Sequence, residues 1–288
     1  MHWREMPELN PSSWQSDSLV EGAGGLLLSS RAMQALTRLR LLIDRYARPI
    51  QIEEDIFQIR TLGAKVTVIR SKTGILLIDA GPRGSLPLVA GGLKSLGAEL
   101  KDIELVAVTH SHPDHAGGLP ALVTASGAAV ATHDLEAAAL SGIKGPANPF
   151  RPRLLRTLSR PLIAALNAGA TNVDLALEDG DKLPWPEEVR VIHTPGHTPG
   201  SICLFLPQRG LLIPGDAMQY RFRRLSLPAN LVTLDPALAR ESLAKLSDLD
   251  IRTIGFSHFA PLRSDASEEL KRLLHRRESG PRRTGGET

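Results

Sequence analysis

Residues 109–115 of this 288-residue chain place three histidines and one aspartate within a single short segment, in the order His110, His112, Asp114 and His115. Imidazole nitrogens and carboxylate oxygens are ligands for zinc and iron. No cysteine lies nearby, so the cluster is not of the structural zinc-finger kind. The chain has only 9 histidines in all, which makes such a cluster rare by chance. The segment therefore predicts a metal site.

Three more candidate ligands occur later in the chain, each after a predicted strand. His197 lies in a loop rich in proline and glycine, Asp216 in a Pro-Gly-Asp turn, and His258 at the end of a Phe-Ser-His sequence. The histidine cluster likewise follows the apolar run 103–108. Side chains that follow strands in this way can converge at one edge of a sheet. We therefore expect a site for two metals.

The elements that position these residues follow from hydrophobic periodicity, with glycine and proline as boundaries. Strands are predicted at residues 56–59, 65–69, 75–78, 103–108, 128–131, 173–177, 189–193, 202–206, 211–213 and 251–255. Helices are predicted at residues 86–96, 119–124, 134–140, 236–246 and 267–274. Strands and helices mixed in this order indicate one α/β domain with helices outside packed sheets.

The motifs together resemble the metallo-β-lactamase fold superfamily of hydrolases. The resemblance rests on the HxHxDH motif at 110–115, the later His, Asp and His in that order, and Asp79 in an Ile-Asp-Ala-Gly sequence. It extends over about residues 55–275. It implies an α/β fold, a four-layer αβ/βα sandwich of two mixed β-sheets flanked by helices.

The resemblance also implies a dinuclear metal centre. Seven side chains match the family's ligands: His110, His112 and His197 for the first metal, Asp114, His115 and His258 for the second, and Asp216 as the carboxylate that bridges both. Two divalent ions are expected, zinc first, with iron or manganese as alternatives. Asp79 resembles the residue that steadies the histidine loop, and a plain turn aspartate is the alternative. His193 is expected to support the ligands or to pack beside them.

Two divalent ions about 3.5–4 Å apart can hold a hydroxide between them and present it as a nucleophile at neutral pH. We therefore predict a metal-dependent hydrolase that attacks a small ester, lactone or thioester, with Asp114 and Asp216 as catalytic residues. The alternatives are an oxidoreductase similar to the mononuclear iron persulfide dioxygenases, or a phosphodiesterase or nuclease of the same superfamily.

Relatives within the superfamily differ at recognisable positions. True β-lactamases generally lack the bridging aspartate, so Asp216 argues against that activity. Glyoxalase II enzymes share every ligand but continue into a longer helical domain, whereas 30 residues follow His258 here. Acyl-homoserine lactonases place a tyrosine three residues after the bridging aspartate, where this chain has Gln219, with Tyr220 one residue further on.

Residues 141–172 carry only positive charges, set among many leucines. The resemblance implies that this segment is a helical lid insertion over the metals. An apolar channel with arginines for an anionic group is one interpretation, and a solvated amphipathic helix is the other. Arg151, Arg156, Tyr220 and Arg221 are the candidate substrate-binding residues, and the expected partner is a small molecule, anionic or amphipathic.

Composition limits the binding partners and the cellular location that can be expected for the protein. The net charge of +3 is too small to indicate nucleic-acid binding. The single cysteine, Cys203, excludes an internal disulfide and is expected in the core. No apolar run is long enough to cross a bilayer and no secretory signal is recognised, so no membrane span and a cytoplasmic location are expected.

Residues 1–50 are predicted as an N-terminal extension, partly disordered or a peripheral helix, residues 51–276 as the hydrolase domain, and residues 277–288 as a disordered tail.

Overall fold

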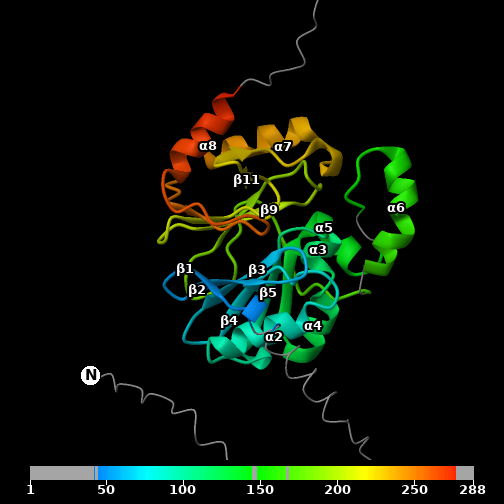
Figure 1. Cartoon of the computed structure of the whole chain (residues 1–288), viewed down its shortest axis with the longest axis vertical. Helices are drawn as coiled ribbons and strands as arrows, with labels where there is room; N and C mark the ends of the chain where they lie inside the picture. Colours follow the sequence, from blue (N-terminus) through cyan, green and yellow to red (C-terminus); the bar gives the residue numbers. More distant parts are fainter. Residues whose placement is uncertain (1–41, 43–44, 145–147, 167–168, 277–288) are drawn as a thin grey trace, which may run out of the picture. The chain divides into compact units, whose positions relative to one another are not determined.

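Two β-sheets lie face to face, with helices on the outer side of each (Figure 1). The computed structural model describes residues 42, 45–144, 148–166 and 169–276, all within one compact unit, Arg40–Thr288. This architecture confirms the predicted α/β sandwich of two mixed sheets flanked by helices. Nearly all of the predicted N-terminal extension and the whole predicted tail lie outside the described residues.

The larger sheet has seven strands whose spatial order follows the sequence. Its first strands form antiparallel hairpins, and from β4 onward neighbouring strands are parallel. The strands are β1 (Ile50–Glu53), β2 (Ile56–Arg60), β3 (Lys65–Arg70), β4 (Ile75–Ile78), β5 (Ile103–Val108), β6 (Ala129–His133) and β7 (Leu175–Leu177).

The smaller sheet has the order β13-β10-β9-β8, with β10 and β13 parallel and the other pairs antiparallel. Its strands are β8 (Arg190–His193), β9 (Ile202–Leu206), β10 (Leu211–Ile213) and β13 (Thr253–Ile254). A separate hairpin, β11 (Gln219–Arg221) and β12 (Arg224–Ser226), follows β10 in the chain.

Alternation along the strands divides the buried side chains among three cores. In β4, Ile75 and Leu77 face the outer core, whereas Leu76 and Ile78 face the core between the sheets. In β9, Cys203 faces the third core and is fully buried, as expected. The helices that cover the two outer faces are α2 (Leu86–Ser95) and α4 (Leu119–Ser126) on the larger sheet, and α7 (Pro236–Ser242) and α8 (Ala266–His275) on the smaller.

Several elements differ from the sequence prediction. The expected helix 236–246 ends as α7 at Ser242 and continues as a 3-10 turn, Leu243–Leu246. The β1 strand and the β11–β12 hairpin were not expected. Within the predicted lid segment the structure has α6 (Arg153–Leu166), which stands at the right-hand edge of Figure 1. Among the described residues, none of the helices combines the length and apolar character needed to cross a bilayer.

Candidate metal centre

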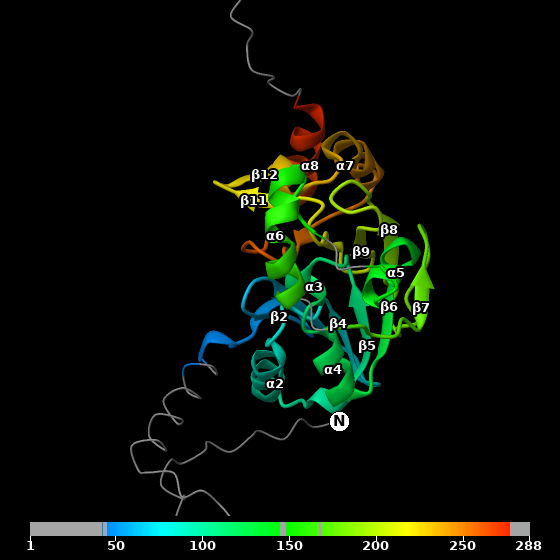
Figure 2. The same ribbon diagram turned by 90° about the vertical axis from the view of Figure 1, so that its right-hand side faces the viewer.

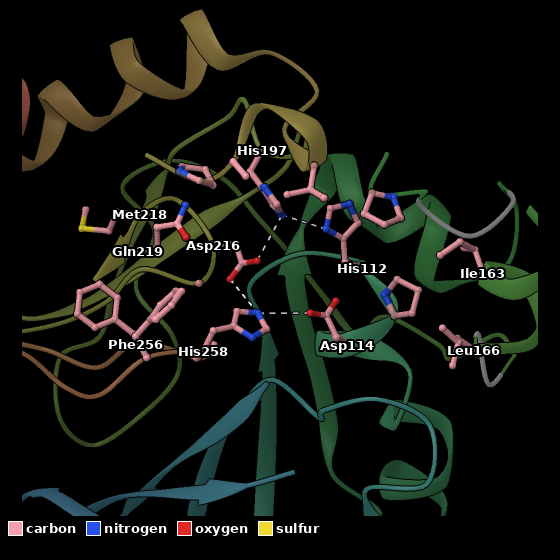
Figure 3. Close-up of a pocket in the computed structure, with 18 residues that line it drawn as sticks. His112, Asp114, Ile163, Leu166, His197, Asp216, Met218, Gln219, Phe256 and His258 are labelled. Carbon is pink, nitrogen blue, oxygen red and sulfur yellow. Dashed lines mark hydrogen bonds and ion pairs between the residues drawn. The ribbon is translucent and has the colours of Figure 1, made fainter. Parts of the chain in front are cut away.

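The predicted ligands come from loops that leave neighbouring strand ends of both sheets. The histidine cluster follows β5 and enters the short helix α3 (Pro113–Ala116), where Pro113 occupies the first turn. The loops after β8, β10 and β13 bring His197, Asp216 and His258 to the same place. Figure 3 shows five of them pointing toward one another from the two sheets: His112, Asp114, His197, Asp216 and His258.

Three buried histidines form the first group, His110, His112 and His197. Nδ1 of His112 lies 3.1 Å from Nε2 of His110 and 3.0 Å from Nε2 of His197. A neutral imidazole has one N–H and one lone pair, so three ring nitrogens this close cannot all be satisfied by one another. A cation that accepts the lone pairs satisfies all three at once.

The second group contains Asp114, His115, Asp216 and His258, whose ligand atoms lie within 4.8 Å of one another. Nε2 of His258 lies 3.3 Å from Asp114 and 3.4 Å from Oδ1 of Asp216. The other oxygen of Asp216, Oδ2, lies 3.6 Å from Nε2 of His197. Each oxygen of Asp216 therefore faces a different group, which is the placement that a bridging carboxylate requires.

The electrostatics of the two groups differ. Burial lowers the pKa of His112 to about 3, and it also lowers those of His110 and His197. These imidazoles are therefore neutral at neutral pH, the form that binds metals. In the second group burial would lower the pKa of His258, but Asp114 and Asp216 raise it to about 9.

The carboxylates of the second group thus stabilise a positive charge placed beside them. Burial would raise the pKa of Asp216, but His115 keeps it well below its ordinary value. The donors are nitrogen and oxygen with no sulfur, a set that suits zinc, iron or manganese. The residues present therefore fit two divalent cations.

Asp79 contacts the start of the histidine loop. Its Oδ1 accepts hydrogen bonds from the backbone N–H and the hydroxyl of Thr109, and its Oδ2 lies 2.7 Å from Nδ1 of His115. This contact leaves Nε2 of His115 facing the second group. Asp79 has φ of 63°, an unusual conformation for a residue other than glycine that the surrounding contacts must hold in place.

Glu136, on α5 (Asp134–Leu140), is a residue of the site that the sequence interpretation missed. Its side chain is buried and accepts hydrogen bonds from the hydroxyl and backbone N–H of Ser111, from the hydroxyl of Thr198 and from the backbone N–H of Gly200. Ser111 lies between two histidines of the cluster, and Thr198 follows His197. One carboxylate therefore ties together the two loops that supply the three-histidine group.

A cavity of about 410 Å³ opens over both groups (Figure 3). His112, Asp114, His197, Asp216 and His258 lie along it. Much of its wall is apolar and comes from Pro149, Ile163, Leu166, Met218, Pro228, Ala229, Val232, Phe256 and Phe259. Ile163 and Leu166 belong to α6, so this helix forms one side of the cavity.

The structure does not bring the predicted substrate residues to the wall of this cavity. Arg156 lines a separate groove on α6. The ring of Tyr220 stacks on Phe256, with centroids 6.0 Å apart, and Arg221 lies over Phe222. Arg151 is bound through its backbone N–H to the carbonyl of Leu231. Gln219, beside Tyr220, lies at the cavity instead.

His193 lies outside both groups. Its Nε2 is 2.8 Å from the carbonyl oxygen of Pro199, and its ring stacks on His133 at 3.9 Å. It therefore contacts the loop that carries His197.

Comparison with protein families agrees with the motifs and the fold. Residues 59–258 match the model of the metallo-beta-lactamase superfamily, a span that includes every one of the seven clustered side chains. The chain belongs to the metallo-β-lactamase superfamily. This is a superfamily of metal-dependent hydrolases, as the sequence motifs indicated.

The individual relatives share less than a third of their aligned residues with this chain. The chain is 28% identical to a probable metallo-hydrolase of Bacillus subtilis, over 69% of this chain and 82% of that protein. It is 29% identical to a human acyl-coenzyme A thioesterase, over 54% of this chain and 58% of that protein. A metallo-beta-lactamase family protein of Thermus thermophilus has the same fold, with a TM-score of 0.60 at 21% identity over 77% of this chain and 79% of that chain.

Proposed function

We propose that this protein is a dinuclear metal-dependent hydrolase that cleaves the thioester bond of small acyl compounds. The observation that carries the proposal is Asp216, whose two oxygens face two separate donor groups beside one cavity. In this proposal His110, His112 and His197 hold the first metal, and Asp114, His115 and His258 hold the second. Zinc is the metal we expect at both positions.

Two observations favour a thioester over other bonds. The human relative is an acyl-coenzyme A thioesterase, and a hydroxyacylglutathione hydrolase of Pseudomonas aeruginosa is 31% identical over 51% of this chain and 44% of that protein. The apolar wall formed by Ile163, Leu166 and Phe256 suits an acyl group rather than a charged one.

The proposed reaction adds water to the thioester carbonyl and breaks the C–S bond, which gives a carboxylic acid and a thiol. Two bound divalent ions would supply an activated water molecule and polarise the carbonyl. Asp114 is the carboxylate that we assign to proton transfer, because its side chain is 41% exposed at the cavity while Asp216 is only 20% exposed. It would take a proton from water and deliver it to the departing sulfur.

The test is metal analysis of the purified full-length protein, combined with assays on acyl thioesters, lactones, aryl esters and phosphodiesters. We expect two zinc ions per chain and turnover of thioesters. His112→Ala and Asp216→Ala should lose metal and turnover together, whereas His275→Ala, an exposed histidine on α8, should keep both. One iron per chain with oxygen consumption on a persulfide would contradict the proposal.

A further inference from the structure

Two chain segments beside the cavity are strongly basic. Residues 148–166 and 217–234 together contain seven Arg and no Lys, Asp or Glu, which leaves 27 basic against 31 acidic residues in the rest of the chain. We call these two segments the basic rim. Both supply side chains to the cavity wall, and the backbone N–H of Arg151 in one donates to the carbonyl of Leu231 in the other.

The outer surface of α6 carries leucines as well as arginines. Leu154, Leu158 and Leu162 follow one another at intervals of four residues and are 70%, 67% and 59% exposed. The spacing puts them on one side of the helix. Arg153, Arg156 and Arg160 lie on another side, and Ile163 is the residue of α6 that is buried. A row of exposed leucines on one side of a helix forms an apolar patch, and such a patch commonly marks a site of contact with another protein or a membrane.

The β11–β12 hairpin also combines an exposed apolar side chain with arginines. Phe222 at its turn is 91% exposed and stands between Arg221 and Arg223. Phe222 and Arg223 both have left-handed backbone conformations, with φ of 50° and 61°, which are rare for a bulky side chain. In Figure 2 the hairpin projects from the upper left of the unit, free of the sheets.

The arginines of the rim have no acidic partners in the described part of the chain. No carboxylate lies within 4.0 Å of the guanidinium groups of Arg153, Arg156, Arg160, Arg221, Arg223 or Arg224 there. The rim therefore presents uncompensated positive charge next to exposed leucine and phenylalanine side chains.

We propose that the basic rim docks the protein on an anionic phospholipid bilayer. An amphipathic helix with exposed leucines and arginines binds at the lipid–water interface, where anionic headgroups attract the cations and the acyl region accepts the apolar side chains. A free phosphate compound would pair with the arginines but would leave the leucines and Phe222 exposed. A two-fold contact between copies would set the same cations against one another.

Docking in this way brings the cavity close to the bilayer, because both rim segments border it. An acyl substrate could then enter from the membrane. The docking surface goes beyond the proposed hydrolase activity and does not depend on it, since lipid binding is measured without substrate.

The experiment measures sedimentation of the full-length protein with phosphatidylcholine vesicles that contain or lack phosphatidylglycerol. We expect binding only to the vesicles with phosphatidylglycerol, and weaker binding as salt increases. The double variant Leu158→Ser/Leu162→Ser, the variant Phe222→Ser and the double variant Arg156→Gln/Arg160→Gln should each bind at least about tenfold more weakly. Leu135→Ser, an exposed leucine on α5, and Lys94→Gln on α2 are the matched controls and should bind as the native protein does.

The proposal is wrong if the native protein stays in the supernatant with anionic vesicles, or if the rim variants bind as tightly as the controls. Light scattering is measured in parallel. A dimer that Leu158→Ser/Leu162→Ser abolishes, with no vesicle binding, would assign the face to self-association and overturn lipid docking. Metal content and hydrolysis of a short water-soluble thioester, followed in every variant, report separately on the proposed function.

Discussion

At the scale of single residues, the buried carboxylate of Glu136 determines how two ligand loops meet. It accepts hydrogen bonds from Ser111, Thr198 and Gly200, and none of these is itself a candidate ligand. In Glu136→Gln one oxygen becomes an NH₂ group that faces a donor. We expect a loss of about 2 kcal/mol in the free energy of unfolding, because hydrogen bonds to a buried charged group are among the stronger ones.

The same change should weaken metal binding by the three-histidine group, since its two loops would no longer be held in register. Urea unfolding of the metal-free protein measures the first effect, and competition with a chelator measures the second. Asp134→Asn, an exposed acid on the same helix, is the control and should change neither. Equal zinc affinity in Glu136→Gln and the native protein would show that Glu136 does not position the ligands.

The sequence could reveal the candidate ligands but not Glu136. Each candidate ligand is of a metal-binding type, belongs to a family motif and follows an apolar run, so chemistry and position agree. Glu136 instead occurs in the first turn of a helix, where an acidic residue is ordinarily exposed. Its partners Ser111 and Thr198 are far away in the sequence, and the fold alone brings them to it.

At the scale of elements, α7 packs directly on the loop that carries His197. Gly196 in this loop has φ of 132°, and a Cβ atom there would lie 2.2 Å from the backbone nitrogen of Ala239 on α7. Gly196→Ala therefore combines backbone strain with a clash that only movement of α7 or the loop can relieve. We expect a loss of about 3 kcal/mol in the free energy of unfolding.

The matched control is Gly97→Ala. Gly97 also has a positive φ, of 70°, but a Cβ there would meet nothing within 4 Å. This variant should lose only about 1 kcal/mol, the cost of the backbone conformation alone. Urea denaturation compares the two variants, and equal losses would show that contact with α7 is unimportant.

The elements that sequence reasoning could predict are those with a strong apolar pattern. Strands such as β5 and β9 are almost wholly apolar, and the sequence predicts them with their observed bounds. The β11 and β12 strands are three residues each and rich in arginine, so hydrophobic periodicity does not mark them. Tyr220 was assigned to substrate, but its ring stacks on Phe256 beside the third core, a packing that depends on long-range contacts.

At the scale of the whole molecule, Lys65 joins the two sheets near the metal centre. It lies on β3 of the larger sheet, and its Nζ donates to the carbonyls of Ser257 and Phe259, on either side of His258. Burial, together with nearby Arg60, lowers its pKa to about 8. The unfolded chain, with an ordinary lysine pKa near 10.5, binds more protons than the folded one between these values.

The contribution of Lys65 to stability should therefore rise with pH from about 8 to 10.5. We expect the difference in free energy of unfolding between the native protein and Lys65→Met to grow by about 2–3 kcal/mol over this range. Denaturation at several pH values measures it, and Lys72→Met, on the turn after β3, gives the baseline. A difference that does not change with pH would show that Lys65 keeps an ordinary pKa.

The metal centre is a second connection between the sheets, because its ligands come from loops of both. His110 and His112 follow β5 of the larger sheet, whereas His197 and Asp216 follow β8 and β10 of the smaller one. Bound cations would hold the sheets together at this edge, and the unfolded chain would lose that coordination.

Metal at about 100 times its dissociation constant should therefore stabilise the protein by about 3 kcal/mol. For a chain of this size we expect a chelator to lower Tm by about 5–10 °C and added zinc to restore it. Asp216→Ala should show a smaller change on chelation, whereas Asp248→Asn, an acidic residue beyond the site, should respond as the native protein does. Thermal unfolding with and without chelator tests this, and an unchanged Tm in the native protein would mean that the two sheets are held together without the metals.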